Sequence, residues 1–238
     1  MLASHKINKH FGSFQVLKEV DFRVDAGEAV GVVGPNGAGK TTLFGILAGA
    51  LTPSTGEVSF LDRDVTALDA AERCRAGIAR THQVPRPFLD MTVFENVSVA
   101  ASHGSGETGA RASEFAVEAL LTAGLIDHAN RAATTLGLLD RKRLELARAL
   151  ATRPKVLLLD EIGGGLTERE LEQLVALVLD LKRSGMTIVW IEHILHALLD
   201  VIDRLVCMNA GSVIAQGDPG AVMSDPIVRR AYLGAGTA

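Results

Sequence analysis

Hydrophobic residues along the chain fall into short continuous runs and longer stretches of helical spacing. The apolar runs at 29–33 and 155–161 predict buried strands, and the run at 186–191 predicts a further strand. Between and after them, apolar residues recur with the spacing of one helix face. These stretches predict the following helices: one beginning at Lys40, then 92–102, 111–124, 140–152, 167–183, 193–200 and a last one in the C-terminal segment DPIVRRAYLG. Strands that alternate with helices predict a mostly parallel sheet.

Two other groups of segments complete the predicted architecture. Additional strands are expected at 4–9, 20–25, 56–61, 77–82, 203–208 and 211–216, with a turn around Gly12 joining the first two. The stretch 84–152 contains mainly helical patterns. We therefore predict one α/β domain over residues 1–238, in which a core of about 1–83 and 153–238 includes an antiparallel β subdomain and carries a helical lobe at 84–152.

Composition narrows the function classes. The formal net charge is -4, so the chain has no basic field to attract nucleic acid, and we predict no nucleic-acid partner. Cys74 and Cys207 lie far apart without metal-site spacing, which predicts two reduced thiols. The N-terminus lacks the apolar core of a signal peptide, and no run approaches the roughly 20 apolar residues that span a bilayer. We expect a cytoplasmic chain that reaches a membrane only through partners.

One segment fits the phosphate-binding pattern G-x-x-x-x-G-K-[ST] in full, between a buried strand and a predicted helix. The segment consists of Gly34, Pro35, Asn36, Gly37, Ala38, Gly39, Lys40 and Thr41, and Thr42 follows it. Its glycines allow backbone N–H groups to surround phosphate oxygens, and the helix N-terminus adds positive potential. Lys40 is expected to reach the β- and γ-phosphates, and Thr41 to bind Mg²⁺. The competing interpretation is an ordinary glycine-rich turn.

A second site is predicted where the strand Val156–Leu159 ends in Asp160 and Glu161. Ligands of α/β folds lie at the carboxyl ends of strands. We expect Asp160 to hold Mg²⁺ through water and Glu161 to polarise the attacking water as general base. The alternative is a strand that ends in solvated acids.

These residues resemble the ATP-binding cassette (ABC) family over nearly the whole chain. The resemblance implies a P-loop NTPase fold that hydrolyses ATP with Mg²⁺. It further implies that Phe11 stacks on adenine, that Gln83 senses Mg²⁺ and the γ-phosphate, and that His193 holds the γ-phosphate and helps to place the water. Core packing is the alternative role for Phe11. The other six of the seven histidines, His82 included, are expected to be structural or solvated.

A narrower resemblance rests on GIARTHQ, MTVFENVSVA, RKRLELARALATRP and the C-terminal AYLG. These segments look like the ATPases of importers for branched-chain and related amino acids, and less closely like lipopolysaccharide-export ATPases. The resemblance implies a second ATPase subunit, two membrane permease subunits and a periplasmic or surface solute-binding protein, with this chain on the cytoplasmic face of the inner membrane. Other transporters (urea or amide uptake), a soluble ATP-driven switch and a regulatory subunit with little turnover stay open.

The segment Val84-Pro85-Arg86-Pro87-Phe88 follows Gln83 and is stiffened by two prolines. Phe88 and Leu89 offer an apolar anchor, which we expect to touch a membrane-subunit helix. The alternative is that this segment packs within the helical lobe.

The chain departs from the family where one subunit contacts its partner's nucleotide. The family has LSGGQ or a near variant such as LAYGQ, whereas residues 136–140 read LGLLD. Leucine cannot let its backbone approach a phosphate as glycine can, and Asp140 adds negative charge. Ile162 replaces a usual proline, and the following loop reads Gly165-Leu166-Thr167. We therefore expect an intact nucleotide site here but an altered contribution to the partner's site, and an asymmetric dimer. Tolerance of the substitution is the alternative.

Overall fold

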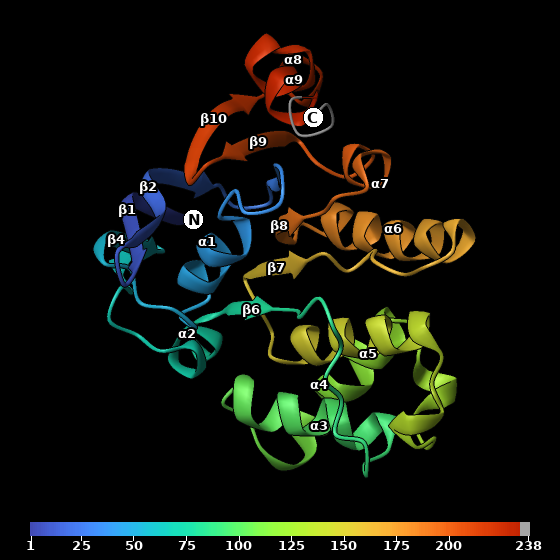
Figure 1. Ribbon diagram of the computed structural model, residues 1–238. Helices are drawn as coiled ribbons and strands as arrows, with labels where there is room; N and C mark the ends of the chain where they lie inside the picture. Colours follow the sequence, from blue (N-terminus) through green and yellow to red (C-terminus); the bar gives the residue numbers. More distant parts are fainter. Residues whose placement is uncertain (234–238) are drawn as a thin grey trace.

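The computed structural model describes the backbone of residues 1–233, which form two β-sheets and a group of helices (Figure 1). The smaller sheet has the order β2-β1-β4-β5 and is antiparallel. Its strands are β1 (Leu2–Phe11), β2 (Phe14–Val24), β4 (Thr55–Phe60) and β5 (Arg63–Asp64). This sheet packs against one face of the larger sheet, and the two share a hydrophobic cluster.

The larger sheet has the order β10-β9-β3-β8-β7-β6, and its pairings are parallel except for the edge strand β10. Its strands are β3 (Ala29–Val33), β6 (Ile78–Arg80), β7 (Val156–Asp160), β8 (Thr187–Ile191), β9 (Arg204–Asn209) and β10 (Ser212–Gly217). Every residue of β3, β7 and β8 is buried. In β7, Val156 and Leu158 face one hydrophobic cluster while Leu157 and Leu159 face the other, as the two-residue period of a strand requires.

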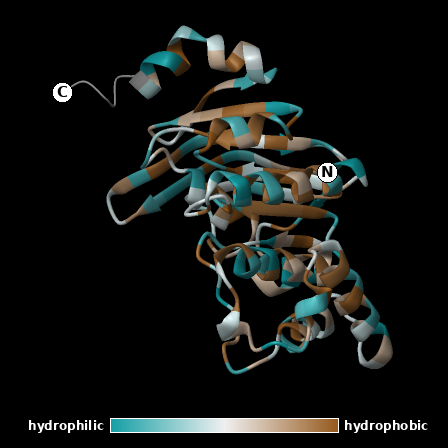
Figure 2. Cartoon of the chain, turned by 90° about the vertical axis from the view of Figure 1, so that its right-hand side faces the viewer, coloured by the Kyte–Doolittle hydropathy of each residue, from teal (hydrophilic) through white to brown (hydrophobic). Residues whose placement is uncertain are grey.

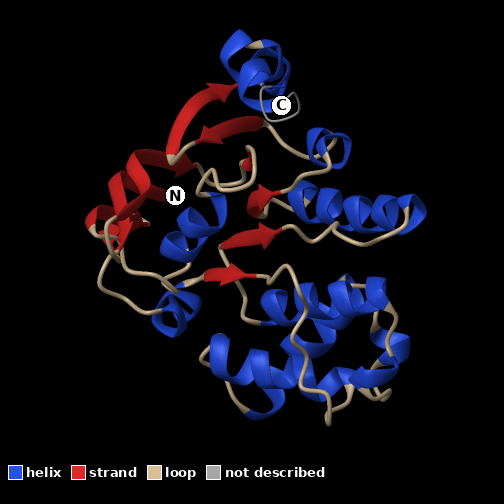
Figure 3. Cartoon of the chain, in the orientation of Figure 1, coloured by secondary structure: helices blue, strands red, loops and turns tan. Residues whose placement is uncertain are grey.

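Helices cover both faces of this sheet (Figures 1 and 3). α1 (Lys40–Leu47) lies between the two sheets, and α6 (Glu168–Arg183) lies on the opposite face. Leu171, Leu174, Val178 and Leu181 form the buried stripe of α6 at helical spacing. Figure 2 shows the result, with hydrophobic strands inside and more hydrophilic helix surfaces outside. The C-terminal part adds α7 (Leu195–Leu199), α8 (Pro219–Ser224) and α9 (Pro226–Leu233).

The chain between β6 and β7 is helical. It contains α3 (Val93–Gly104), α4 (Gly109–Thr122) and α5 (Leu138–Ala151), with short 3-10 turns at Ile126–His128 and Ala133–Thr135. These helices bury a hydrophobic cluster of their own, including Val97, Leu120 and Leu144. Within residues 1–233, no helix is both long and apolar enough to cross a membrane.

The predicted fold class is confirmed, since an α/β core, an antiparallel sheet and a helical group are all present. The hairpin strands β1 and β2 are longer than 4–9 and 20–25, and Cys74 and Cys207 are free thiols. Besides the two 3-10 turns, three elements were not predicted: β5, α2 (Ala70–Ala76) and α8. α2 has the sequence AAERCRA and offers no apolar stripe, because the residue that it buries is Arg73.

Arg73 is completely buried and serves as a polar link between α2 and α1. Its guanidinium donates to the carbonyl oxygens of Ile46 (2.5 Å), Leu47 (3.0 Å), Thr66 (3.2 Å) and Leu68 (3.2 Å). Two of these carbonyls belong to the C-terminal turn of α1, and that of Ile46 also accepts the amide of Gly49 at 3.2 Å. The single side chain therefore satisfies several buried acceptors.

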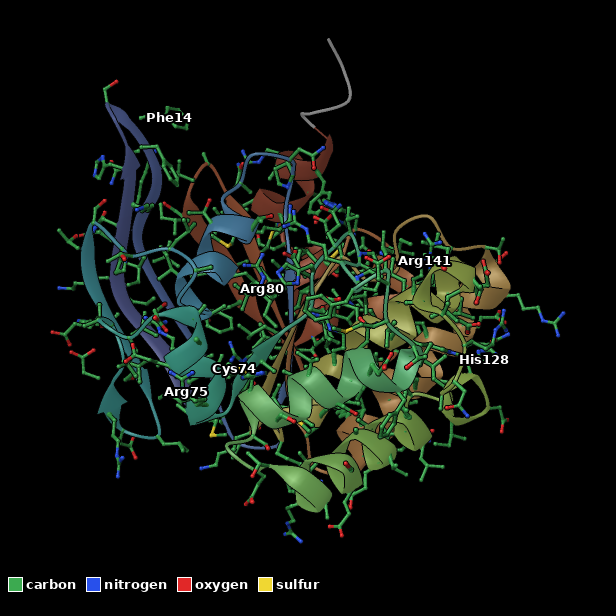
Figure 4. All side chains as sticks on the ribbon, turned by 90° about the horizontal axis from the view of Figure 1, so that it is seen from below. Phe14, Cys74, Arg75, Arg80, His128 and Arg141 are labelled. Carbon is green, nitrogen blue, oxygen red and sulfur yellow. The ribbon has the colours of Figure 1, made fainter. Side chains whose placement is uncertain are left out.

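Replacing Arg73 with Met should lower the free energy of unfolding by about 3 kcal/mol, because buried carbonyls lose their donors. Urea unfolding followed by the fluorescence of the single, buried Trp190 measures this loss. Arg75→Met is the matched control, since Arg75 lies on the exposed side of the same helix (Figure 4). Equal stability of the two variants would contradict the structural role of Arg73.

Candidate nucleotide-binding site

The phosphate loop connects the buried strand β3 to α1. Gly34, Gly37 and Gly39 have φ values of 150°, 79° and 99°, which side-chain-bearing residues rarely adopt. A Cβ atom at Gly34 would lie 2.1 Å from the carbonyl oxygen of Met208, and one at Gly39 would lie 2.6 Å from Leu17 Cδ2. Gly34 and Gly39 are therefore required by both the backbone conformation and the neighbours, and Gly37 by its backbone conformation alone. The loop ends at the N-terminus of α1, where N–H groups and the helix dipole favour an anion.

Lys40 begins α1 and lies almost buried at the mouth of this loop. Its Nζ donates to the carbonyl oxygens of Gly34 at 2.7 Å and Pro35 at 3.1 Å. Burial lowers the pKa of Lys40, and the negative charges of Glu161 and Asp160 oppose this shift. The two threonines that follow, at 41 and 42, occupy the first turn of α1. The ammonium of Lys40 and the hydroxyls of Thr41 and Thr42 therefore directly follow the loop in the sequence.

Asp160 and Glu161 lie where β7 ends, but they face different partners. Asp160 is buried, and one carboxylate oxygen lies 2.6 Å from Nη2 of Arg80, whose side chain is partly exposed (labelled in Figure 4). Glu161 has a φ of 46°, an uncommon conformation for a non-glycine residue and one that clusters at functional sites. Its amide donates to the carbonyl of Ile191 on the neighbouring strand.

Three of the predicted site residues meet at one point. Glu161 Oε1 lies 2.7 Å from His193 Nε2, and Glu161 Oε2 lies 2.5 Å from Gln83 Nε2. Gln83, Glu161 and His193 follow β6, β7 and β8, so parallel neighbouring strands deliver them to the same edge of the sheet. Both oxygens of the carboxylate are held, which fixes its orientation.

Phe11 lies apart from this group, at the end of β1. Its ring is 49% exposed, so it is not part of the hydrophobic core, and the ammonium of Lys9 lies 5.0 Å from the ring centre. Phe14, across the two-residue turn, is 70% exposed and projects from the tip of the hairpin (Figure 4). An exposed aromatic face is what stacking on a base requires.

α5 holds the segment that contains Gln83, and the sequence analysis did not identify the residues responsible. Lys142 Nζ donates to the carbonyl of Gln83 at 2.7 Å. Glu145 lies 2.7 Å from His82 Nδ1, and Arg148 donates to the carbonyl of Arg86 at 2.6 Å. The three α5 residues are three positions apart and therefore share one helix face. In the sequence, this three-residue spacing of charged side chains was the signal that could have pointed to a contact with the proline-rich segment.

The charged side chains Lys142, Glu145 and Arg148 on this face of α5 stabilise one another or their neighbours. Although burial pushes the pKa of Glu145 upward, the hydrogen bond from His82 and the charge of Arg148 hold it below its ordinary value. Burial lowers the pKa of Lys142, whereas attraction to Glu192, Glu145 and Glu161 opposes that shift.

The unusual segment 136–140 forms the start of α5. Gly137 is the N-cap residue, Leu138 is 42% exposed, and Leu139 packs partly against the core. The carboxylate of Asp140 pairs with His128 Nδ1 at 3.4 Å and Arg143 Nη1 at 3.6 Å. The guanidinium of Arg143, on the same helix, therefore partly neutralises the charge of Asp140.

The side chains at this site also fit a magnesium ion. Mg²⁺ prefers oxygen ligands, and it is usually bound by one or two carboxylates together with substrate phosphates. The Thr41 hydroxyl, the Asp160 carboxylate and the Gln83 amide are such donors. Residues 1–233 contain no cluster of three or more His, Cys, Asp or Glu side chains that could hold a metal by themselves.

The fold and this site define a P-loop nucleotide-binding protein, and comparisons with known proteins refine the class. A family model described as ABC transporter matches residues 17–163, and one described as branched-chain amino acid ATP-binding cassette transporter matches residues 212–238. The high-affinity branched-chain amino acid transport ATP-binding protein LivG of Salmonella typhimurium is 36% identical over 98% of each chain. The corresponding BraF of Pseudomonas aeruginosa is 34% identical over 96% of this chain and 95% of its own.

A solved structure gives the same result. The ADP conformation of an ATP-binding cassette of an ABC transporter is 34% identical to this chain and superposes with a TM-score of 0.90, covering 98% of both chains. The chain belongs to the ABC transporter ATPase family. The resemblance found in the sequence motifs is confirmed, and with it the assignment as an ATP-hydrolysing, nucleotide-binding enzyme.

Proposed function

We propose that this ATPase powers an importer of branched-chain or other hydrophobic amino acids. The full-length similarity to branched-chain amino acid transport proteins supports the substrate class, as does the match of the C-terminal residues to a model of that group. The observation that carries the chemical part is the carboxylate of Glu161, held between Gln83 and His193 beside the phosphate loop.

In this proposal the phosphate loop and Lys40 bind the phosphates, and Phe11 stacks on the adenine. Thr41, Asp160 (through water) and Gln83 would hold Mg²⁺, which would neutralise charge on the phosphate oxygens when bound. Lys40 stays close to the same oxygens because its Nζ is tethered to loop carbonyls.

Glu161 then acts as general base and takes a proton from the attacking water. His193 fixes one carboxylate oxygen and orients the water toward the γ-phosphate, while Gln83 fixes the other oxygen. Because Gln83 also contacts α5 through Lys142, any displacement of the helical group reaches the carboxylate. Binding of a partner to that group can therefore influence hydrolysis.

The proposed partners are a second ATPase subunit, two membrane permease subunits and, indirectly, a solute-binding protein, which places the chain on the cytoplasmic face of the membrane. A cleft of about 550 Å³ lined by α2, α3, β6 and α5 supports permease docking. Phe88 lies at this cleft and is 44% exposed, and Leu89 beside it is 53% exposed. The guanidinium carbon of Arg148 lies 5.0 Å from the centre of the Phe88 ring. Co-purification with permease subunits from detergent extracts, followed by uptake of labelled leucine in proteoliposomes, tests this assembly.

Phe88→Ala should reduce permease-stimulated ATPase activity and transport by about tenfold, because an apolar anchor at an interface contributes on the order of 1–2 kcal/mol. The basal ATPase activity of the isolated chain should be unchanged. Leu121→Ala is the control, since Leu121 is 57% exposed on α4 and does not line the cleft. Normal stimulation of the Phe88 variant by the permease would show that the docking assignment is wrong.

We also propose that the dimer is asymmetric. A nucleotide in this family lies between one subunit's phosphate loop and the partner's LSGGQ-type segment, and this chain offers Leu138 and Leu139 where glycines are usual. The carboxylate of Asp140 contacts the side chains of His128 and Arg143. A relative with a standard segment would complete the nucleotide site of this chain, and this chain would complete the relative's site poorly.

A further inference from the structure

Glu192 is a buried carboxylate that the proposed chemistry does not use. It follows directly after β8, precedes His193, and is only 2% exposed. Buried carboxylates are rare unless they are paired or hydrogen-bonded. Glu192 accepts three backbone N–H groups: Oε2 accepts from Gly163 at 3.0 Å, and Oε1 accepts from His193 at 2.9 Å and Ile194 at 3.4 Å.

These three amides belong to the two loops that carry the site. Gly163 lies two residues after Glu161, and His193 follows Glu192 itself. The side chains of Glu161 and His193 meet at 2.7 Å, so their relative position depends on the spacing of the loops. The Glu192 carboxylate is hydrogen-bonded to both loops and so sets the distance between them.

Close packing around Gly163 shows that this bridge is tight. A Cβ atom at Gly163 would lie 2.9 Å from Glu192 Oε2 and 2.9 Å from Leu171 Cδ1. Real Cβ atoms essentially never make contacts this short, so an alanine at this position would have to displace the Glu192 carboxylate or the Leu171 side chain. The loop after Glu161 is thus held between Glu192 and α6.

The chemistry of the bridge requires a carboxylate. Both of its oxygens accept hydrogen bonds and neither donates. Glutamine has the same shape, but one of its two terminal atoms is a donor. Whichever way a glutamine turned, it would present an N–H group to a backbone N–H group and release either the Gly163 loop or the His193 loop.

We propose that Glu192 is a positioning residue for ATP hydrolysis, holding the Glu161 and His193 loops at the separation that keeps the two side chains in contact. This inference rests on the proposed roles of Glu161 and His193. The inference predicts that loss of the Glu192 carboxylate slows hydrolysis without weakening ATP binding, because the phosphate loop and Lys40 lie on a different segment.

The test compares Glu192→Gln with wild type in single-turnover hydrolysis by the full chain within its assembled transporter. We expect the rate to fall by about 10- to 100-fold, since misplacement of a catalytic group by about 1 Å has that effect. ATP affinity should stay within about threefold of wild type, which marks loss of an interaction needed only for the chemical step. Glu72→Gln is the matched control, because Glu72 also accepts a backbone N–H group but does so at the distant α2 cap.

A second variant, Gly163→Ala, displaces the same carboxylate without changing its charge, and it should show the same loss of rate with retained affinity. It keeps the test decisive if the first variant unfolds, which Trp190 fluorescence reports. A hydrolysis rate within about threefold of wild type in the folded variants, or an equal loss of ATP affinity, would overturn the inference. Failure of the proposed function is distinguishable, because it appears as normal hydrolysis by Glu161→Gln, whereas failure of this inference leaves Glu161→Gln inactive.

Discussion

Lys40→Ala should abolish tight ATP binding, with affinity reduced by about 100-fold or more. The phosphate loop loses the cation that lies across its mouth, and the remaining backbone N–H groups of the loop cannot replace its charge. Isothermal titration with ATP and Mg²⁺ measures the change. The exposed Lys18 provides the control variant Lys18→Ala, for which affinity should be unchanged.

The alanine variant should remain folded, because Lys40 makes its two hydrogen bonds to a loop rather than to the core. Unfolding monitored by Trp190 checks this point. Unaltered ATP affinity in a folded Lys40→Ala protein would contradict the assignment of residues 34–41 as the phosphate-binding site.

Glu161→Gln should slow hydrolysis by about 10²- to 10⁴-fold while leaving ATP affinity near that of wild type. The substitution preserves shape but removes the group that accepts the proton from water. In the proposed mechanism ATP binding closes the dimer and hydrolysis opens it, so the variant should also accumulate as an ATP-bound dimer. Rapid-quench hydrolysis and size-exclusion chromatography with ATP measure the two effects.

Glu172→Gln is the control for this substitution, because Glu172 is exposed on α6 and contacts neither loop of the site. Hydrolysis by Glu161→Gln at a rate close to wild type would show that Glu161 is not the base. Loss of ATP affinity together with the rate would instead indicate a binding role.

The parts of the site that could be predicted from sequence are those with local signals. The phosphate loop is a continuous pattern between a strand and a helix, and Asp160 and Glu161 end an unbroken apolar run. The placement of Gln83 and His193 came from family resemblance, and the order of β6, β7 and β8 gives it a physical reason. Parallel neighbours carry their C-terminal residues to one edge.

The parts that could not be predicted depend on contacts between distant segments. Arg73 and Glu192 are charged residues that become buried because backbone groups far along the chain satisfy them. Lys142 and Glu145 face the segment 82–83, about 60 residues earlier, through hydrogen bonds that no periodicity reveals. A hydropathy pattern assigns such residues to the surface, so elements such as α2 were missed.

The altered segment 136–140 shows where local reasoning needed the structure. From sequence, Asp140 simply adds negative charge near a phosphate site. In the structure, His128 and Arg143 hold its carboxylate, while Leu138 remains 42% exposed at the start of α5. The bulk of the leucines, more than the charge of Asp140, therefore distinguishes this segment from a glycine-containing one.

The most direct test of the central claim is ATP hydrolysis by the assembled transporter after substitution of one catalytic glutamate at a time. The claim is that the phosphate loop, Glu161 and His193 of this chain form the hydrolysing site of an asymmetric dimer. The account predicts that Glu161→Gln in this chain removes most of the activity, while the matching change in the partner ATPase removes little. Equal losses from the two substitutions, or full activity after the change in this chain, would contradict it.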